Sequence, residues 1–269
     1  MGTKKLGNSP KMLMFQLLYV EQPNVVVEAV VEQLRKIYPS VEYNEQAKGL
    51  IFPEIEIEYE NHRGPAQCVI MAGEQYERAA LEEAFLQQNW HWNEAAEVEQ
   101  MCAYSLSVSD FMSRGLEPRV RIVLLQQVLL AFVKVTKPSA IVSIHGEKLI
   151  DPVVFEADCQ DPNYVALDLV ANVRLFNINN PEYKQFLMDT IGLHSLGLSD
   201  FQLFFDQKEY IEAVASRLWD YAYYTMQVGD VIDQGHTIEG LEEGSKWDCT
   251  KEYSASQPKR TIINIEAKE

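Results

Sequence analysis

The chain has 269 residues, of which 47% are hydrophobic and 23% are charged, and its formal net charge is −17. This length and composition allow a substantial buried core and exclude an intrinsically disordered chain. The charge argues against nucleic acids and anionic membranes as partners, because proteins bind both through lysine and arginine.

Cysteine spacing and hydropathy bear on the cellular compartment. The stretch Met12–Val20 is too short for a secretory signal core, and no segment reaches the roughly 18 apolar residues that span a bilayer. The cysteines are dispersed and form no C-x-x-C pair. We therefore expect a cytoplasmic location and four reduced thiols, at Cys68, Cys102, Cys159 and Cys249.

The first predicted elements are a flexible polar tail, a strand, a helix and a strand pair. The tail covers residues 1–11, the strand 11–19, and the helix begins at Pro23 and ends before Pro39. In residues 49–60 isoleucines alternate with glutamates, which is typical of a strand with one solvated face, and residues 66–71 return as a second strand. This β-α-β-β order predicts a ferredoxin-like half at the N-terminus.

The middle of the chain alternates helices with short strands. A helix from Glu117-Pro118 to Thr136 has a wide apolar stripe, and Asp151-Pro152 carries the capping signal of a short helix. The remaining predicted elements here are helices over 76–92 and 94–102 and strands over 104–111 and 140–144.

The last third predicts strands within residues 164–177 and 186–205, a helix, and a closing hairpin. Asp206 and Glu209 have the spacing of a capping box at the start of a helix that ends at Gly229. The hairpin pairs residues 247–255 with 260–265. The whole pattern predicts an α+β fold with mostly antiparallel sheets and packed helices. We expect one domain over residues 12–269, with two subdomains divided near residues 179–181 as the alternative.

Sequence motifs of common chemistries are missing. There is no G-x-S-x-G elbow, no G-x-x-x-x-G-K-[ST] loop and no G-x-G-x-x-G loop, and no two histidines lie within four residues of each other. We therefore expect no catalytic residue, no metal site and no cofactor. An alternative polar site would be assembled across the fold from Asp189, His194, Asp200 and His236.

Residues 76–102 are acidic and aromatic and contain a single arginine. The simpler interpretation is a pair of amphipathic helices with a solvated acidic side. The functional interpretation is a docking face with aromatic anchors, as in binding hot spots. Its residues are Glu77, Glu82, Glu83, Trp90, Trp92, Glu94, Glu97 and Glu99.

Residues 188–205 combine Asp189 and Thr190 with two Gly-Leu pairs and a closing apolar run. Gly192 and Gly197 predict sharp turns, so we expect this segment to form part of the core. Together with residues 172–177 and 230–240, it resembles the bacterial family called domain of unknown function 4261. The resemblance extends from Met12 to Ile265 and implies no activity and no catalytic residue.

The acidity and the missing motifs favour a non-enzymatic, cytoplasmic module that binds a basic protein. One form of this hypothesis is an immunity-type protein that neutralises a basic bacterial toxin. The alternative is a hydrolase-like enzyme that uses the polar site, and a third hypothesis is a housekeeping structural module.

Overall fold

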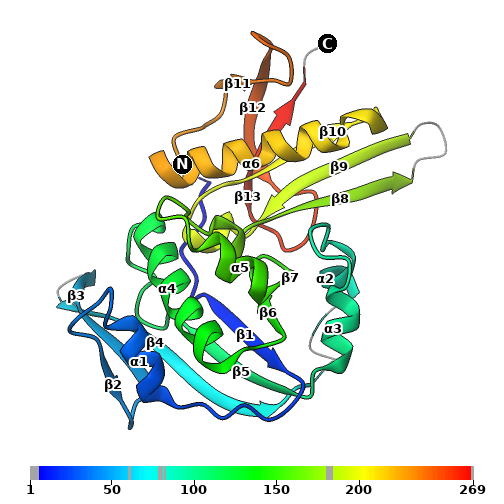
Figure 1. Cartoon of the computed structure of the whole chain (residues 1–269). Helices are drawn as coiled ribbons and strands as arrows, with labels where there is room; N and C mark the ends of the chain where they lie inside the picture. The colour runs from blue at the N-terminus through cyan, green and yellow to red at the C-terminus, as the bar shows by residue number, and fades with distance from the viewer. Residues whose placement is uncertain (1–5, 60–61, 78–80, 82, 180–183, 268–269) are drawn as a thin grey trace. The chain divides into compact units, whose positions relative to one another are not determined.

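The chain forms two compact units. The computed structural model describes residues 6–59, 62–77, 81, 83–179 and 184–267. The N-terminal unit comprises residues 12–170, and the C-terminal unit comprises residues 171–267 together with residues 6–11. Each unit contains one sheet and its own helices, so the predicted α+β class with mostly antiparallel sheets is confirmed (Figure 1). The division falls between Val170 and Ala171 and not near residues 179–181.

A seven-stranded sheet forms the centre of the N-terminal unit. Its order is β2-β3-β4-β5-β1-β6-β7, and every neighbouring pair is antiparallel. The strands are β1 (Met14–Tyr19), β2 (Glu42–Asn44), β3 (Gly49–Tyr59), β4 (His62–Gln75), β5 (Tyr104–Ser109), β6 (Ala140–Ser143) and β7 (Lys148–Ile150). The ferredoxin-like arrangement does not form, because β5 lies between β4 and β1.

The helix predicted over residues 118–136 is present as α4 (Pro118–Thr136). The Glu117 side chain caps it by accepting hydrogen bonds from the backbone N–H groups of Arg119 and Val120, and Lys137 ends it in the left-handed conformation. The other helices of this unit are α1 (Val27–Leu34), α2 (Glu83–Gln87), α3 (Ala95–Met101) and α5 (Pro152–Asp158). Helices α1 and α5 both pack against α4.

The helix predicted over residues 76–92 is wrong in its extent. Strand β4 continues to Gln75, which pairs with Tyr104, and the Tyr76 N–H donates to the Ala103 carbonyl. The helix that does form, α2, is short. Phe85, together with other side chains of α2 and α3, packs against buried residues of β1, β6 and β7. Pairing with a strand distant in sequence thus replaces the predicted helix at Tyr76.

The C-terminal unit contains a six-stranded sheet of order β11-β12-β13-β10-β9-β8. The β10–β13 pair is parallel and the other pairs are antiparallel. The predicted closing hairpin is confirmed as β12 with β13. The strands are β8 (Asn172–Asn179), β9 (Lys184–Ile191), β10 (Asp200–Phe205), β11 (Thr237–Glu239), β12 (Lys246–Tyr253) and β13 (Thr261–Glu266).

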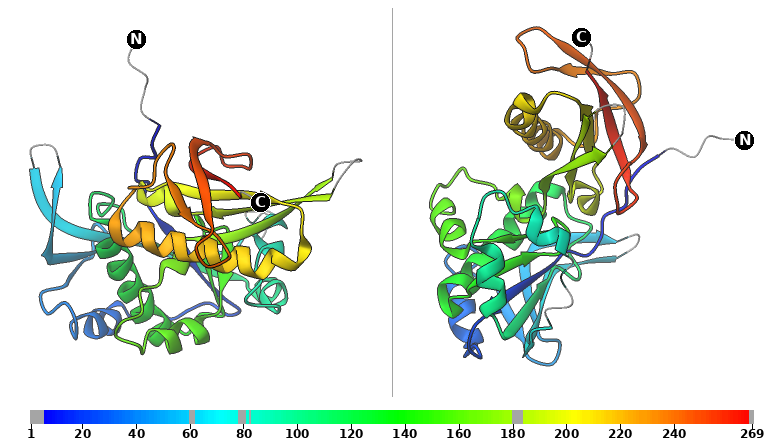
Figure 2. Two further views of the ribbon diagram at one scale, coloured as in Figure 1. Left: turned by 90° about the horizontal axis from the view of Figure 1, so that it is seen from above. Right: turned by 90° about the vertical axis from the view of Figure 1, so that its right-hand side faces the viewer.

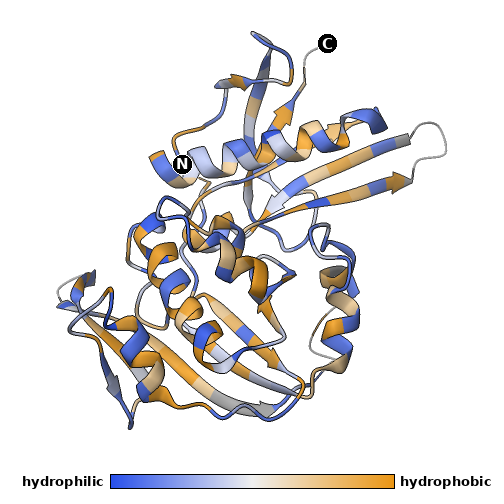
Figure 3. Ribbon diagram, viewed as in Figure 1, coloured by the Kyte–Doolittle hydropathy of each residue, from blue (hydrophilic) through white to orange (hydrophobic). Residues whose placement is uncertain are grey.

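Helix α6 (Ile211–Val228) crosses one face of strands β8, β9 and β10 (Figure 2). Hydrophobic and hydrophilic residues alternate along it, as expected of a helix with one buried side (Figure 3). The predicted capping box at Asp206 and Glu209 does not form. A 3₁₀ turn (Lys208–Tyr210) precedes α6, and no side chain caps the helix.

Residues 6–11 were predicted to be part of a flexible tail, and the structure corrects this. The Asn8 side-chain amide donates to the carbonyls of Leu198 and Thr261 at 2.7 and 2.9 Å, and its oxygen accepts from the Thr261 N–H at 3.0 Å. The Lys11 N–H donates to the Ser195 carbonyl at 2.8 Å. These bonds hold the segment against the C-terminal unit, to which it belongs.

The cysteines are free thiols, and Cys68, Cys102 and Cys249 are buried. Burial raises the pKa of Cys159 and of Cys249 to about 11. Both thiols are therefore poor nucleophiles near neutral pH. Among the described residues, no helix has both the length and the apolarity that crossing a membrane requires.

Candidate functional site

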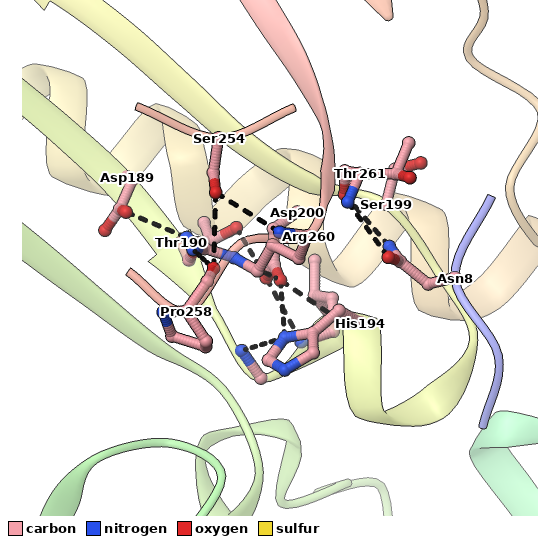
Figure 4. A network of polar contacts seen from close by, with 12 residues as sticks. Asn8, Asp189, Thr190, His194, Ser199, Asp200, Ser254, Pro258, Arg260 and Thr261 are labelled. Carbon is pink, nitrogen blue, oxygen red and sulfur yellow. Dashed lines mark hydrogen bonds and ion pairs between the residues drawn. The ribbon is translucent and has the colours of Figure 1, made fainter. Parts of the chain in front are cut away.

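Three of the four residues of the predicted polar site come together in the C-terminal unit. Asp189 lies near the end of β9, Asp200 begins β10, and His194 lies in the 3₁₀ turn between these strands (Figure 4). All three are buried, and both aspartates are 0% exposed. The tight connection explains the cluster, because antiparallel neighbours joined by a short turn keep their ends close.

Asp189 is bound by two arginines. Arg174 lies directly opposite it on β8, and its Nε and Nη2 donate to the two carboxylate oxygens at 2.9 and 2.7 Å. Arg260, which precedes β13, donates from Nη2 to Asp189 Oδ2 at 2.8 Å, and the Ser256 hydroxyl binds the same oxygen. Paired arginine contacts of this kind are among the stronger hydrogen bonds in proteins.

Asp200 is the second anion of the network. Its Oδ2 accepts from Arg260 Nε at 3.0 Å and from His194 Nδ1 at 2.9 Å, and its Oδ1 accepts from the Leu193 N–H and the Thr190 hydroxyl at 3.1 Å. Burial alone would raise the pKa of Asp200, but the bonds from His194 and Arg260 outweigh it and lower the pKa below its usual value. The carboxylate is therefore ionised at neutral pH.

The network is balanced in charge. Two buried aspartates face two buried arginines, Arg174 and Arg260, and Arg260 bridges the aspartates. Removing one partner would leave a buried charge uncompensated, which costs far more than an exposed pair contributes. The arrangement thus fastens β8, β9, β10 and the segment before β13 to one another.

Ser195, His194 and Asp200 are connected in the order of a serine hydrolase triad. The Ser195 hydroxyl lies 3.5 Å from His194 Nε2, and His194 Nδ1 donates to Asp200. The first distance is long for an activated nucleophile, and all three side chains are buried. These contacts can orient the turn, and the Ser195 side chain is buried.

His236 does not join the network. It is exposed in the turn before β11, where its Nδ1 accepts a hydrogen bond from the Asp233 N–H at 3.3 Å. Sequence reasoning missed Arg174 and Arg260 as site residues. Arg174 lies in an apolar strand segment, and a charged residue in such a segment is a signal of burial with a partner. Nothing in the local sequence points to Arg260.

The predicted acidic face is only partly present in the N-terminal unit. Its exposed carboxylates belong to Glu77, Glu83, Glu94 and Glu97. Glu99 is buried and does not contribute to this surface, because it lies on the inner side of α3, and Glu82 lies outside the described residues. Trp90 is 38% exposed, whereas Trp92 packs against the buried cluster beneath α2 and α3.

Residues 189–266 match the family model "Domain of unknown function (DUF4261)". We refer to residues 189–266 as the DUF4261 domain. The match covers the segment from Asp189 through β13 and includes both aspartates of the network and Arg260. The DUF4261 match does not include β8 or Arg174, so the wider resemblance expected from the sequence stays a prediction. No curated protein and no solved structure matches the chain.

The described residues contain no group of three or more His, Cys, Asp or Glu side chains arranged to hold a metal ion. Within the DUF4261 domain, the aspartates of the buried network already accept hydrogen bonds from arginines. The network is therefore suited to stabilising the domain.

Proposed function

We propose that this protein is a non-enzymatic binding module whose partner is a basic protein. The proposal rests on residues 77–97, where exposed carboxylates within and before α3 accompany Trp90, which is 38% exposed. We call this the α3 surface and define it by Glu77, Glu83, Trp90, Glu94 and Glu97. An immunity-type protein that covers a basic toxin is the form of this function that we favour.

Charge and an aromatic anchor have separate roles in such a surface. The net charge of −17 accelerates encounters with a positive surface, and carboxylates close to the contact orient the partner. A tryptophan that is partly exposed before binding and buried afterwards contributes to the lifetime of the complex. We therefore assign the association rate to the glutamates and the dissociation rate to Trp90.

The test begins with the basic protein captured from the native host, used as a purified partner in binding kinetics. Glu94→Lys with Glu97→Lys on α3 is compared with Glu28→Lys with Glu32→Lys on α1. Each pair changes the net charge equally, consists of exposed side chains, and includes one acidic residue in the first turn of its helix. Both pairs therefore alter the long-range attraction of the basic partner equally, and they differ only in where the charge is reversed.

The α3 pair should slow association by at least about tenfold more than the α1 pair, because local charges orient the encounter. Trp90→Ala should raise the dissociation rate by roughly 30-fold, as expected for a hot spot worth about 2 kcal/mol. A neutral or acidic partner, or association rates that respond alike to both pairs, would contradict the proposal.

A hydrolase remains the alternative proposal, with Asp189, His194, Asp200 and His236 as its site. The contact between Ser195 and His194 is the observation in its favour. Its support is weaker, because three of these residues are buried in an ionic network and His236 lies apart. Hydrolysis of p-nitrophenyl acetate that is lost in Ser195→Ala, with unchanged melting temperature, would establish it over the binding module.

A further inference from the structure

A hollow of about 430 Å³ opens on the DUF4261 domain between α6 and β11. Figure 1 shows the end of α6 continuing through a loop into β11. The volume of the hollow lies at the lower end of the roughly 300–1,000 Å³ that is typical of ligand pockets. No residue of the buried ionic network lines the hollow, whereas His236 of the alternative polar site does.

One part of its lining is apolar and partly exposed. Tyr224 and Val231 are each 49% exposed, and Ile232 is buried behind them. Val228, which is 47% exposed, lies one helical turn after Tyr224 and extends the apolar surface beyond the hollow. Apolar side chains exposed together beside a hollow favour a partner that covers them.

The other part of the lining has an excess of negative charge. Arg217 Nη1 lies 3.5 Å from an Asp220 oxygen and 3.7 Å from a Glu239 oxygen, and both carboxylate side chains are 64% exposed. These distances exceed the roughly 2.7–2.9 Å of a close charged hydrogen bond, so both carboxylates keep acceptor capacity. Among the residues that line the hollow, one arginine is shared by two carboxylates, which leaves one negative charge unbalanced within the lining.

The remaining polar groups do not offset that charge. His236 Nδ1 accepts a hydrogen bond from the Asp233 backbone N–H, so this nitrogen offers no donor to an anion. The Tyr221 hydroxyl donates to the Glu239 carbonyl, and burial raises the pKa of Tyr221. An anion entering the hollow would meet two carboxylates, whereas a single cation would make the charges equal.

We propose that this hollow receives one arginine or lysine side chain of a protein partner. Asp220 and Glu239 bind the cationic group, and Tyr224 and Val231 contact its aliphatic stem and a neighbouring apolar residue. The proposal rests on the proposed function, in which the partner is a basic protein, and adds a sequence-specific contact to it. It predicts that the partner presents a basic residue next to an apolar one.

The test uses two peptides and no native partner. Acetyl-Leu-Arg-amide is compared with acetyl-Leu-citrulline-amide, which has almost the same shape but no charge. Binding is followed by amide chemical shifts of the ¹⁵N-labelled full chain. The arginine peptide should shift the amides of Tyr224, Thr237 and Glu239, and the citrulline peptide should bind at least about tenfold more weakly, since one charged hydrogen bond is worth more than that factor.

Matched variants locate the binding. Asp220→Asn with Glu239→Gln should weaken the arginine peptide at least about tenfold, whereas Glu242→Gln with Glu243→Gln, exposed and just beyond the hollow, should change it by less than about twofold. Equal binding of both peptides, equal effects of both variant pairs, or no localised shifts would each overturn the proposal. Glu94 and Glu97 are not among the residues that line the hollow, so failure here is distinguishable from failure of the proposed function.

Discussion

The backbone at Gly197 gives the sharpest stability prediction. Gly197 ends the 3₁₀ turn of the ionic network with φ +85°, and a Cβ atom built there would lie 2.9 Å from Pro10 Cγ and 3.0 Å from Pro10 Cδ. Positive φ costs an L-residue roughly 1–2 kcal/mol, and forcing an extra methyl group into a filled space costs roughly 1–3 kcal/mol. We therefore expect Gly197→Ala to lower the free energy of unfolding by about 2–5 kcal/mol.

Gly244 provides the matched control in the same unit. Its φ is +79°, and a Cβ there would meet no atom within 4 Å. Gly244→Ala therefore has the backbone cost without the steric one, about 1–2 kcal/mol. The effect of either alanine on the unfolded chain is the same and cancels in the comparison. In a Pro10→Ala background, Gly197→Ala should cost no more than Gly244→Ala.

Urea unfolding is followed through NMR peaks of the C-terminal unit, because a chain with two units need not unfold in one step. The reasoning predicts that Gly197→Ala loses at least about 1 kcal/mol more than Gly244→Ala and that Pro10→Ala removes this difference. Equal losses from the two glycines would refute the close contact between residues 10 and 197.

Three further results are expected. Arg260→Met should lower the free energy of unfolding by about 3–5 kcal/mol, because it leaves two buried aspartates short of a partner. Arg119→Met, at an exposed side chain, should change this free energy by less than about 0.5 kcal/mol, and a similar loss from both variants would contradict a buried network. Because the pKa of Asp200 is lowered in the folded state, the stabilisation from its carboxylate is complete above pH about 4 and is lost as pH falls through the folded-state pKa. Asp200→Asn should therefore reduce the fall of the unfolding free energy at acidic pH. An equal fall in the variant and the unmodified protein would contradict this. Cys159, with its pKa raised to about 11, should react with iodoacetamide at pH 8 roughly 100-fold more slowly than a free thiol, and a reaction as fast as that of a free thiol would contradict this. After unfolding without reductant, four thiols should titrate, and a smaller number of thiols would contradict the expectation of four reduced cysteines.

Elements with local signals were predictable from the sequence. Glu117-Pro118 and Asp151-Pro152 mark the starts of α4 and α5, because a capping carboxylate and a proline at the first helical position act within one turn. The closing hairpin of residues 247–255 with 260–265 was predicted as well, and it forms as β12 with β13. The helix predicted over residues 76–92 is shorter in the structure, and its first residue, Tyr76, instead donates its N–H to the Ala103 carbonyl, a contact that no local pattern records.

For the polar site too, contacts between residues close in sequence were predictable and contacts between residues far apart in sequence were not. Asp189, His194 and Asp200 are close in sequence, and a short turn between two strands was enough to bring them together. Arg260 lies 60 residues beyond Asp200 in the chain and reaches it only through the parallel pairing of β10 with β13. His236 was grouped with the site by residue type alone, and the turn that holds it belongs to a different edge of the sheet.

The central claim is that a basic protein docks on the α3 surface, and the salt dependence of its association rate tests this most directly. As ionic strength rises from about 0.01 M to about 0.15 M, the Debye length falls from about 30 Å to about 8 Å. The association rate of the unmodified protein should fall at least about tenfold over this range, and the Glu94→Lys, Glu97→Lys variant should show a clearly shallower dependence than the Glu28→Lys, Glu32→Lys control. An association rate that does not change with salt, or one with the same salt dependence in both variants, would contradict the account.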